Sequence, residues 1–285
     1  MQRRLERCAE HRWELAQARP EADLAGDVVR YAGYREQSGW SIDQREVASP
    51  IVPLIIGFGD PFRVRLGSGD ASEHRSFVAG LYDGYADVAS LGSAHCMQVD
   101  FTPLGARRFF GMPMRDLTGR TVALDLVGRF DELRERLFEA AGWTHRFALL
   151  DRFVRRRLGE AAPPSSRVAW AWRQLVRSSG CIKVGALADE VAWSRKHLAQ
   201  RFSMEVGVAP KTLGRILRFA GTRKAIDTSV RARTQIDWAG LAADRGYADQ
   251  AHLVREFHTL AGVAPTTYVR DAAGRFRALD GVPPR

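Results

Sequence analysis

The sequence predicts two unlike halves. The first is an α+β N-terminal domain, a small antiparallel β-barrel or sandwich with helices, and the second is an all-α domain with two helix-turn-helix motifs. Short segments rich in β-branched residues and separated by turns indicate the strands, and a repeated helical pattern indicates the duplicated motifs. We therefore expect a β-rich first domain with helices at residues 1–158, a linker at 159–166 and a helical domain with the two motifs at 167–285.

The second half contains an internal duplication with a constant offset of 55 residues. The matched landmarks are Leu198 and Leu253, Phe202 and Phe257, Gly207 and Gly262, and Pro210 and Pro265. In each copy a short helix (187–191 or 236–245) and a turn precede a longer helix, which Ser194 or Asp249 is placed to cap. Helix, turn and capped helix are the outline of a helix-turn-helix motif.

Three further residues predict the turns and the connection between the motifs. Gly246 suits the tight turn of the second motif, whereas Ala192 occupies that place in the first. We expect Ala192 to adopt a left-handed backbone, at a cost of order 1 kcal/mol. Pro210 suits the first turn of a helix, so a linker helix is expected over residues 210–227.

Residues 167–270 resemble the DNA-binding domain of AraC/XylS-type bacterial transcription regulators. The resemblance is carried by LADEVAWSRKHLAQRFSMEVGVAP and by IDWAGLAADRGYADQAHLVREFHTLAGVAPTTYVR, which is close to the family's signature. It implies a linker helix between two motifs whose recognition helices enter successive major grooves on one face of the duplex. This chain departs from the family at Ala192 (usually glycine), at Gln200 (commonly arginine) and at Gly221-Thr222, which are expected to interrupt the linker helix.

The position of each residue in the motif predicts which side chains face DNA. These are Arg195, Lys196, Ala199 and Gln200 in the first motif and Gln250, Ala251, Val254 and Arg255 in the second. Arginine matches guanine O6 and N7, and glutamine matches adenine N6 and N7. The alternatives are phosphate contacts for Arg195 and Lys196, and an ion pair within the helix for Arg255. We interpret His197 and His252, also 55 apart, as packing or phosphate-facing residues and not as metal ligands.

The positive charge of the chain is confined to its second half. Residues 1–166 carry 23 basic and 23 acidic side chains, whereas the rest carries 20 basic and 10 acidic ones, the whole of the net +10. A neutral first half and a basic second half suggest that only the basic half binds a polyanion. A solvated basic surface is the alternative on charge alone.

In the first half, residues 1–20 are expected to form a short polar helix or a loose tail. Strands are expected at residues 28–37, 42–49, 51–66 (with a turn near 57–61), 76–82, 85–91 and 95–101, and helices at 103–110, 114–117, 130–141 and 143–158. The apolar stripe of the last helix suggests a core within the chain or, alternatively, a dimer contact. We expect the Pro-Pro linker to separate the domains and the tail beyond Arg270 to be mobile.

The first half shows no catalytic or metal pattern. His74, His95, Cys96 and Asp100 lack the spacing of a metal site. The three cysteines, Cys8, Cys96 and Cys181, form no CxxC pair, which fits a reducing cytoplasm. The aromatic residues Tyr31, Tyr34, Trp40, Phe58 and Phe62 are candidates to line a ligand pocket or simply to fill the barrel.

Together these observations predict a cytoplasmic, sequence-specific transcription regulator that is not an enzyme and needs no cofactor. The expected partner is double-stranded operator or promoter DNA, with a small-molecule effector, a homodimer partner and, for an activator, RNA polymerase as possible others. No signal peptide or membrane segment is expected. A small-molecule sensing role of the first half is implied only by a loose resemblance. The alternatives are an enzyme-like barrel fused to a DNA-targeting domain and an architectural DNA binder.

Overall fold

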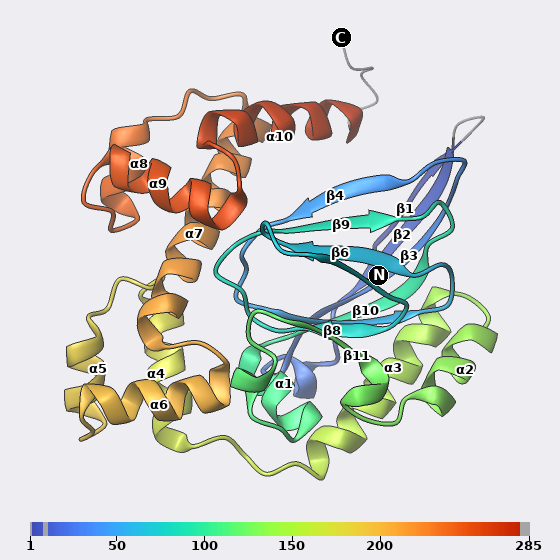
Figure 1. Cartoon of the computed structure of the whole chain (residues 1–285), viewed down its shortest axis with the longest axis horizontal. Coiled ribbons are helices and arrows are strands. Elements are labelled where there is room, and N and C mark those ends of the chain that lie inside the picture. Colours follow the sequence, from blue (N-terminus) through green and yellow to red (C-terminus); the bar gives the residue numbers. More distant parts are fainter. Residues whose placement is uncertain (1, 8–10, 280–285) are drawn as a thin grey trace.

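The computed structural model describes residues 2–7 and 11–279, with side chains within residues 12–272. The N-terminal part contains two antiparallel sheets that face each other without closing into one barrel (Figure 1). In the described residues the larger sheet has the order β1-β2-β3-β10-β5-β8-β11 and the smaller has the order β4-β9-β6-β7. The strands are β1 Gln2–Arg7, β2 His11–Ala18, β3 Val28–Ser38, β4 Ile42–Glu46, β5 Val52–Gly57, β6 Phe62–Leu66, β7 Ala71–His74, β8 Phe77–Ala79, β9 Ala86–Ser90, β10 His95–Phe101 and β11 Thr121–Ala123.

Alternate residues of β3 serve two different layers. Tyr31 and Gly33 face the helices, where Tyr31 stacks on Phe147 with 6.2 Å between ring centroids. A Cβ atom at Gly33 would lie 2.3 Å from the Trp143 ring, so only glycine lets the helix approach this closely. The intervening residues point to the opposite side, toward the smaller sheet. This period of two is the ordinary geometry of a strand buried on both faces.

Three helices cover the outer face of the larger sheet: α1 Pro103–Phe110, α2 Asp131–Glu139 and α3 Trp143–Gly159 (Figure 1). The Thr102 hydroxyl caps α1 by accepting a hydrogen bond from the Gly105 backbone N–H at 3.0 Å. Each side chain in the apolar stripe of α3 is at most 7% exposed and packs within the chain. The stripe therefore forms a core within the chain, the first of the two predicted alternatives. This stripe consists of Trp143, Phe147, Leu150, Val154 and Leu158.

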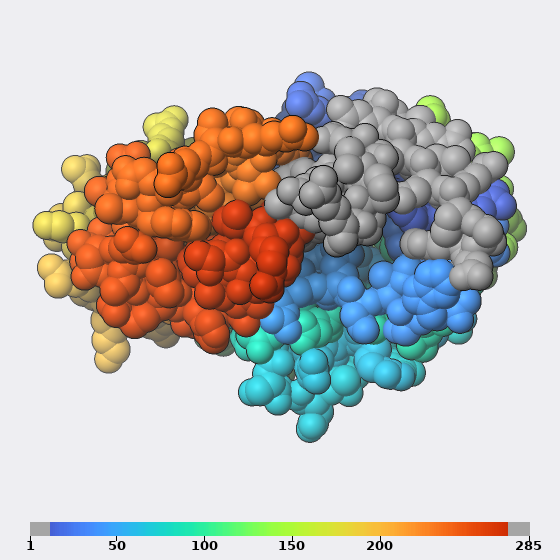
Figure 2. All heavy atoms as spheres, turned by 90° about the horizontal axis from the view of Figure 1, so that it is seen from above, coloured from blue at the N-terminus to red at the C-terminus, as the bar shows by residue number. Residues whose placement is uncertain are grey.

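The C-terminal part is helical and lies against the strands of the first part (Figures 1 and 2). Its helices are α4 Ser166–Arg177, α5 Val184–Glu190, α6 Arg195–Val206, α7 Pro210–Ala232, α8 Trp238–Asp244, α9 Gln250–Ala261 and α10 Pro265–Leu279. The core of the first motif, around Leu198 and Phe202, is continuous with the core of the N-terminal part. The core of the second motif, around Leu253 and Phe257, is separate and includes Ala48.

The linker helix is longer than predicted and is not interrupted. It continues to Ala232 and ends where Arg233 takes a left-handed backbone with φ 56°. Thr222 is fully buried, and its hydroxyl donates to the Arg218 carbonyl at 2.9 Å, so the side chain is satisfied within the helix. The expected interruption at Gly221-Thr222 was therefore wrong.

The predicted N-terminal helix or loose tail was also wrong, because residues 2–7 and 11–18 are strands. β2 pairs along β3, from His11 opposite Ser38 to Ala18 opposite Tyr31. The predicted strand over 42–49 stops at Glu46, and β7 and β11 were not predicted. The expected mobile tail is helical as far as Leu279, and residues 280–285 lie outside the described residues. No described helix is both long enough and apolar enough to cross a membrane.

Candidate nucleic-acid interface and ligand cavity

Helices α6 and α9 begin in the same way at equivalent positions of the duplication. The Ser194 hydroxyl accepts a hydrogen bond from the His197 backbone N–H at 3.1 Å. The Asp249 carboxylate accepts one from the His252 backbone N–H at 2.6 Å. Each cap satisfies an amide that has no partner within the helix, and both predicted caps are confirmed.

Each of these helices has one buried face and one exposed face. The buried sides carry Leu198 and Phe202 in α6 and Leu253 and Phe257 in α9, all fully buried. The eight residues predicted to face DNA lie elsewhere on the two helices. Arg195, Lys196, Gln200, Gln250, Ala251, Val254 and Arg255 are exposed, and Ala199 is half-buried. Helix α6 leads into the start of α7, whereas α9 packs beside α7 farther along, with the Phe257 and Phe219 ring centroids 5.0 Å apart (Figure 1).

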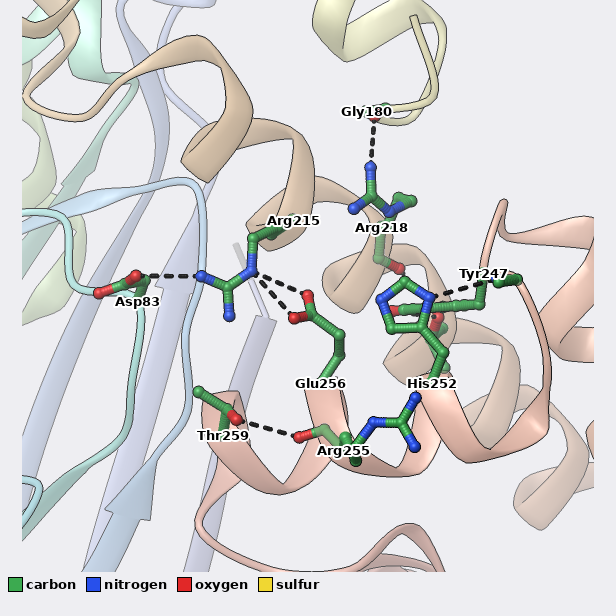
Figure 3. Close-up of polar contacts among 11 residues, drawn as sticks. Asp83, Gly180, Arg215, Arg218, Tyr247, His252, Arg255, Glu256 and Thr259 are labelled. Carbon is green, nitrogen blue, oxygen red and sulfur yellow. Dashed lines mark hydrogen bonds and ion pairs between the residues drawn. The ribbon is translucent and has the colours of Figure 1, made fainter. Parts of the chain in front are cut away.

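Arg255 and its neighbour Glu256 point in different directions (Figure 3). The Glu256 carboxylate accepts hydrogen bonds from Arg215 Nε at 3.1 and 2.9 Å. Arg215 Nη1 also donates to Asp83 of the first domain at 3.3 Å. The Arg255 guanidinium forms no ion pair among the described residues, so the intrahelical pair proposed as its alternative is not present.

The turns of the two motifs confirm the strain expected at Ala192. Ala192 has φ 53° and Gly246 has φ 71°, both in the left-handed region that favours glycine. At Gly246 a Cβ atom would also lie 2.9 Å from the Cys181 sulfur. The first motif therefore carries backbone strain that the second avoids.

The paired histidines pack against aromatic rings at the starts of the two helices. His197 meets the Trp193 ring edge-on with 4.7 Å between centroids, and His252 meets Tyr247 at 5.5 Å. His252 Nδ1 accepts a hydrogen bond from the Ala248 backbone N–H at 3.2 Å. This geometry gives both side chains a packing role.

A cavity of ≈ 640 Å³ lies between the two sheets. It is lined by alternate, inward-facing residues of both sheets, among them Ala32, Tyr34 and Glu36 from β3. Of the aromatic residues considered from the sequence, Tyr34 and Phe62 reach this cavity. The others do not: Tyr31 stacks under α3, Phe58 packs on His95, and Trp40 is 47% exposed.

One wall of the cavity also belongs to the second motif. Val47, Ala48 and Ser49 leave the sheet after β4 and line the cavity. The Ala48 backbone N–H donates to the carbonyl of Leu260 in α9 at 3.1 Å, and the Ala48 side chain is 3% exposed within the core of the second motif. These three residues were predicted as the end of a strand over 42–49, so their contact with the second motif was not foreseen.

Two more hydrogen bonds join the first domain to the two motifs. Thr118 Oγ1 donates to the Gly207 carbonyl at 2.6 Å, where α6 ends. Arg45 Nη1 donates to the Gly262 carbonyl at 3.4 Å, where α9 ends. The Arg45 guanidinium also lies over the Tyr85 ring, 4.3 Å from its centroid. The first domain therefore contacts the ends of both helices that are predicted to face DNA.

The residues considered for a metal site do not converge. His95 packs against Trp143 and Arg146 on the helix-covered face, and burial lowers its pKa to about 4. Asp100 is fully buried and pairs with Arg30. Within the described residues no group of three or more His, Cys, Asp or Glu side chains is arranged to hold a metal ion.

Two protein-family models match separate parts of the chain. Residues 187–271 match one described as a helix-turn-helix domain, and residues 16–123 match one described as a domain of unknown function, DUF6597. A search of curated proteins gives no match. The first match spans the region from the middle of α5 into α10, and so contains both α6 and α9.

Several solved structures are similar to this chain at low identity. The C-terminal domain of AraT, a response regulator from Geobacillus stearothermophilus, is 20% identical, and the match covers 39% of this chain and 88% of that one with a TM-score of 0.35. ToxT from Vibrio cholerae is 9% identical over 92% of this chain and 98% of that one, with a TM-score of 0.46. A ToxT structure with a bound unsaturated fatty acid is 10% identical over 82% and 96%, with a TM-score of 0.42.

Proposed function

We propose that this chain, which belongs to the AraC/XylS family of transcription regulators, binds an asymmetric operator through α6 and α9. Its affinity for that operator changes when a small molecule enters the cavity. The observation that carries the proposal is the pair of capped, equivalent helices with exposed outer faces. Within α6 and α9 every exposed charged side chain is basic, because Glu205 is buried and Glu256 is turned toward Arg215. Such faces suit the edges of bases between two phosphate backbones.

The side chains on these faces suggest that some contact bases and others contact phosphates. Arg255 and Gln250 are suited to base edges, because a guanidinium pairs with guanine and a carboxamide with adenine. Arg195 and Lys196 stand in the first turn of α6, where contacts to phosphates fix the position of a recognition helix. Because the two faces carry different residues, the two halves of the operator differ in sequence.

The length of α7 supports binding to successive major grooves. At about 1.5 Å per residue, its 23 residues span about 35 Å, close to one turn of B-DNA. Helix α6 leads into the start of α7 and α9 packs around Phe219, so this one rigid helix sets the spacing that we propose for the two major grooves. The uninterrupted core of α7, with Thr222 buried, keeps this spacing fixed.

The wall formed by residues 47–49 supports a response to a ligand. It lines the cavity on one side and packs into the core of the second motif on the other. A molecule that fills the cavity and shifts this wall changes how α9 is held. The usual scale of such coupling is about 1–3 kcal/mol in operator affinity.

Selection of bound sequences from random DNA, followed by footprinting with the full chain, tests the DNA-binding part. We expect two protected major-groove segments with unlike sequences, centred about 10 base pairs apart. Affinity should also fall steeply with salt, as counterion release requires. Recovery of random sequence after several rounds would contradict the proposal and favour an architectural role.

A cavity-blocked variant tests the ligand-response part. Val88→Trp places an indole in the cavity from β9, whereas Val29→Trp adds the same group at an exposed position of β3. A small-molecule extract of the host should change the operator affinity of the wild type and of Val29→Trp, but not that of Val88→Trp. An equal response of all three proteins would exclude the cavity as the sensing site.

A further inference from the structure

The cavity holds a buried carboxylate without a cationic partner. Glu36 lines the cavity from β3 and is 1% exposed. Its Oε1 atom accepts hydrogen bonds from Ser38 Oγ at 2.8 Å and Ser90 Oγ at 2.9 Å, and its Oε2 atom accepts from Tyr34 Oη at 2.6 Å. Among the described residues no Lys, Arg or His forms an ion pair with Glu36.

A structural role alone does not require the charge of Glu36. Its hydrogen bond with Ser90 joins β3 of the larger sheet to β9 of the smaller one, but a neutral acceptor such as a glutamine carbonyl can make the same link. Burial of a carboxylate without a cation is costly, so such a group calls for a compensating partner. A carboxylate offers about four acceptor positions, and at most three hydroxyl protons bond to Glu36, with Ser90 Oγ also 3.1 Å from Oε2. The remaining acceptor capacity is available to a donor from the cavity.

The surroundings of Glu36 favour a cation as that donor. Trp13 of β2 stands directly opposite Glu36 in the strand register, and Tyr34 is its neighbour on the same face of β3. Both aromatic residues line the cavity. Aromatic rings beside a carboxylate form a favourable environment for an ammonium group, which they attract through their π-faces.

An anionic ligand finds a poorer site in the same cavity. Arg30 also lines the cavity, but it already pairs with the fully buried Asp100. A second hydrogen bond to Asp100, from Gln98 Nε2 at 2.7 Å, holds that carboxylate in place. A ligand carboxylate could use only the Arg30 N–H groups that Asp100 leaves, and it would meet Glu36 and Glu46 elsewhere in the cavity lining.

The rest of the cavity suits an apolar chain that extends away from Glu36. Ser90 and Ala86 stand at opposite ends of β9, and four residue steps along a strand cover about 14 Å. Glu36 contacts Ser90 at one end, and Val47 and Ala48 lie near the other, where Glu46 pairs with Ala86. Val64, Leu66 and Val88 line the length between them.

We propose that the cavity binds an apolar molecule with a protonated amine, whose ammonium group donates to Glu36 and whose apolar body extends toward residues 47–49. This inference rests on the ligand response proposed above and names the chemical class of that ligand. The ammonium group neutralises the buried carboxylate, and the apolar body contacts the wall shared with the second motif. The same geometry disfavours a fatty acid, because its carboxylate would face Glu36.

Three probes with the same alkyl chain test this chemistry directly: decylamine, 1-decanol and decanoate. Their binding to the full chain, without DNA, is followed by calorimetry and by tryptophan fluorescence, to which Trp13 in the cavity contributes. We expect the amine to bind about tenfold to hundredfold more tightly than the alcohol, the range expected for one charge-assisted hydrogen bond, and decanoate to bind more weakly than either. Tighter binding of decanoate, or binding of none of the probes, would overturn the proposal.

Variants at Glu36 and Arg30 test separately the contributions of these two charged residues of the cavity lining. Glu36→Gln should remove most of the preference for the amine and leave the affinity for the alcohol unchanged, whereas Arg30→Gln should leave the preference for the amine intact. An unchanged amine preference in Glu36→Gln would overturn the assignment.

If Glu36→Gln does not fold, Tyr34→Phe replaces it. The acceptor position that this variant frees on Glu36 should strengthen amine binding, and weaker binding would count against the proposal. Operator binding without a probe is measured on the same variants, so a failure of DNA binding is distinguished from a failure of amine recognition.

Discussion

Gly207 and Gly262, which occupy equivalent places 55 residues apart, both present their backbone carbonyls to the first domain. Gly207 accepts from Thr118 Oγ1 at 2.6 Å, and Gly262 accepts from Arg45 Nη1 at 3.4 Å. The first domain therefore contacts the ends of both α6 and α9 through the same atom of the repeat. The two donors differ in kind, because one is a half-buried hydroxyl and the other is a partly exposed guanidinium.

The hydroxyl contact at Gly207 should contribute to stability. Thr118→Val removes the donor, keeps the volume and leaves the Gly207 carbonyl without its partner. We expect the free energy of unfolding to fall by about 1–2 kcal/mol. Urea unfolding of the full chain measures this, with Thr118→Ser, which keeps the hydroxyl, as the matched control. Equal losses in both variants would assign the effect to packing of the methyl group instead.

Arg45, which contacts Gly262, also forms an ion pair with Asp87, and this ion pair should make the free energy of unfolding depend on pH. The Arg45 guanidinium lowers the pKa of Asp87, and Arg65 acts in the same direction. A carboxyl whose pKa is lower in the folded state stabilises the protein above its unfolded pKa of about 3.9, and this contribution is lost as pH falls through the folded pKa. Asp87→Asn should therefore be less stable than the wild type near neutral pH. The difference should shrink at lower pH, as followed by urea unfolding across a pH series.

Arg255 should contribute to sequence recognition and not to general affinity. Arg255→Ala should weaken operator binding by about 1–3 kcal/mol and relax the preference at one base pair, because a guanidinium fork to guanine is lost. Arg129→Ala removes the same charge from an exposed position of the first domain and serves as the control. Gel-shift titrations on operator and random DNA distinguish the outcomes. A uniform loss on both DNAs would identify a phosphate contact.

The strained turn of the first motif offers a stabilising substitution. Ala192→Gly should raise the free energy of unfolding by up to about 1 kcal/mol, because glycine tolerates the left-handed backbone. Gly246→Ala should have the opposite and larger effect, because the new Cβ atom meets Cys181 at 2.9 Å as well as an unfavourable φ. Thermal and urea unfolding measure both variants. A loss of stability in Ala192→Gly would show that chain entropy outweighs the relief of strain.

Local sequence signals predicted the elements whose ends are marked by residues of special conformation. Helix α1 begins at Pro103 after the Thr102 cap, and its limits were predicted to the residue. The caps at Ser194 and Asp249 and the strain at Ala192 were likewise predicted from single residues. By contrast, β1 and β2 are rich in charged residues and are strands because they extend the sheet beside β3, a partnership between segments that local patterns do not contain.

The cavity could not be predicted for a similar reason. In β3 Glu36 stands between the polar residues Arg35 and Gln37, so the sequence around it is that of a solvated strand end. Only the smaller sheet, laid over this face, buries Glu36 and brings Ser90 to it. The wall at residues 47–49 depends in the same way on contact with Leu260.

The alternation along β3 has an evolutionary consequence. Residues 32, 34 and 36 meet the cavity, whereas residues 31 and 33 fix α3 to the sheet. Point substitutions at the even positions can therefore diversify what descendants of this protein recognise while the scaffold persists. A single inserted codon within the strand would exchange the two sets of side chains and remove both properties at once. Lineages of this protein should accordingly diverge by substitution along β3 and tolerate length changes only at its ends.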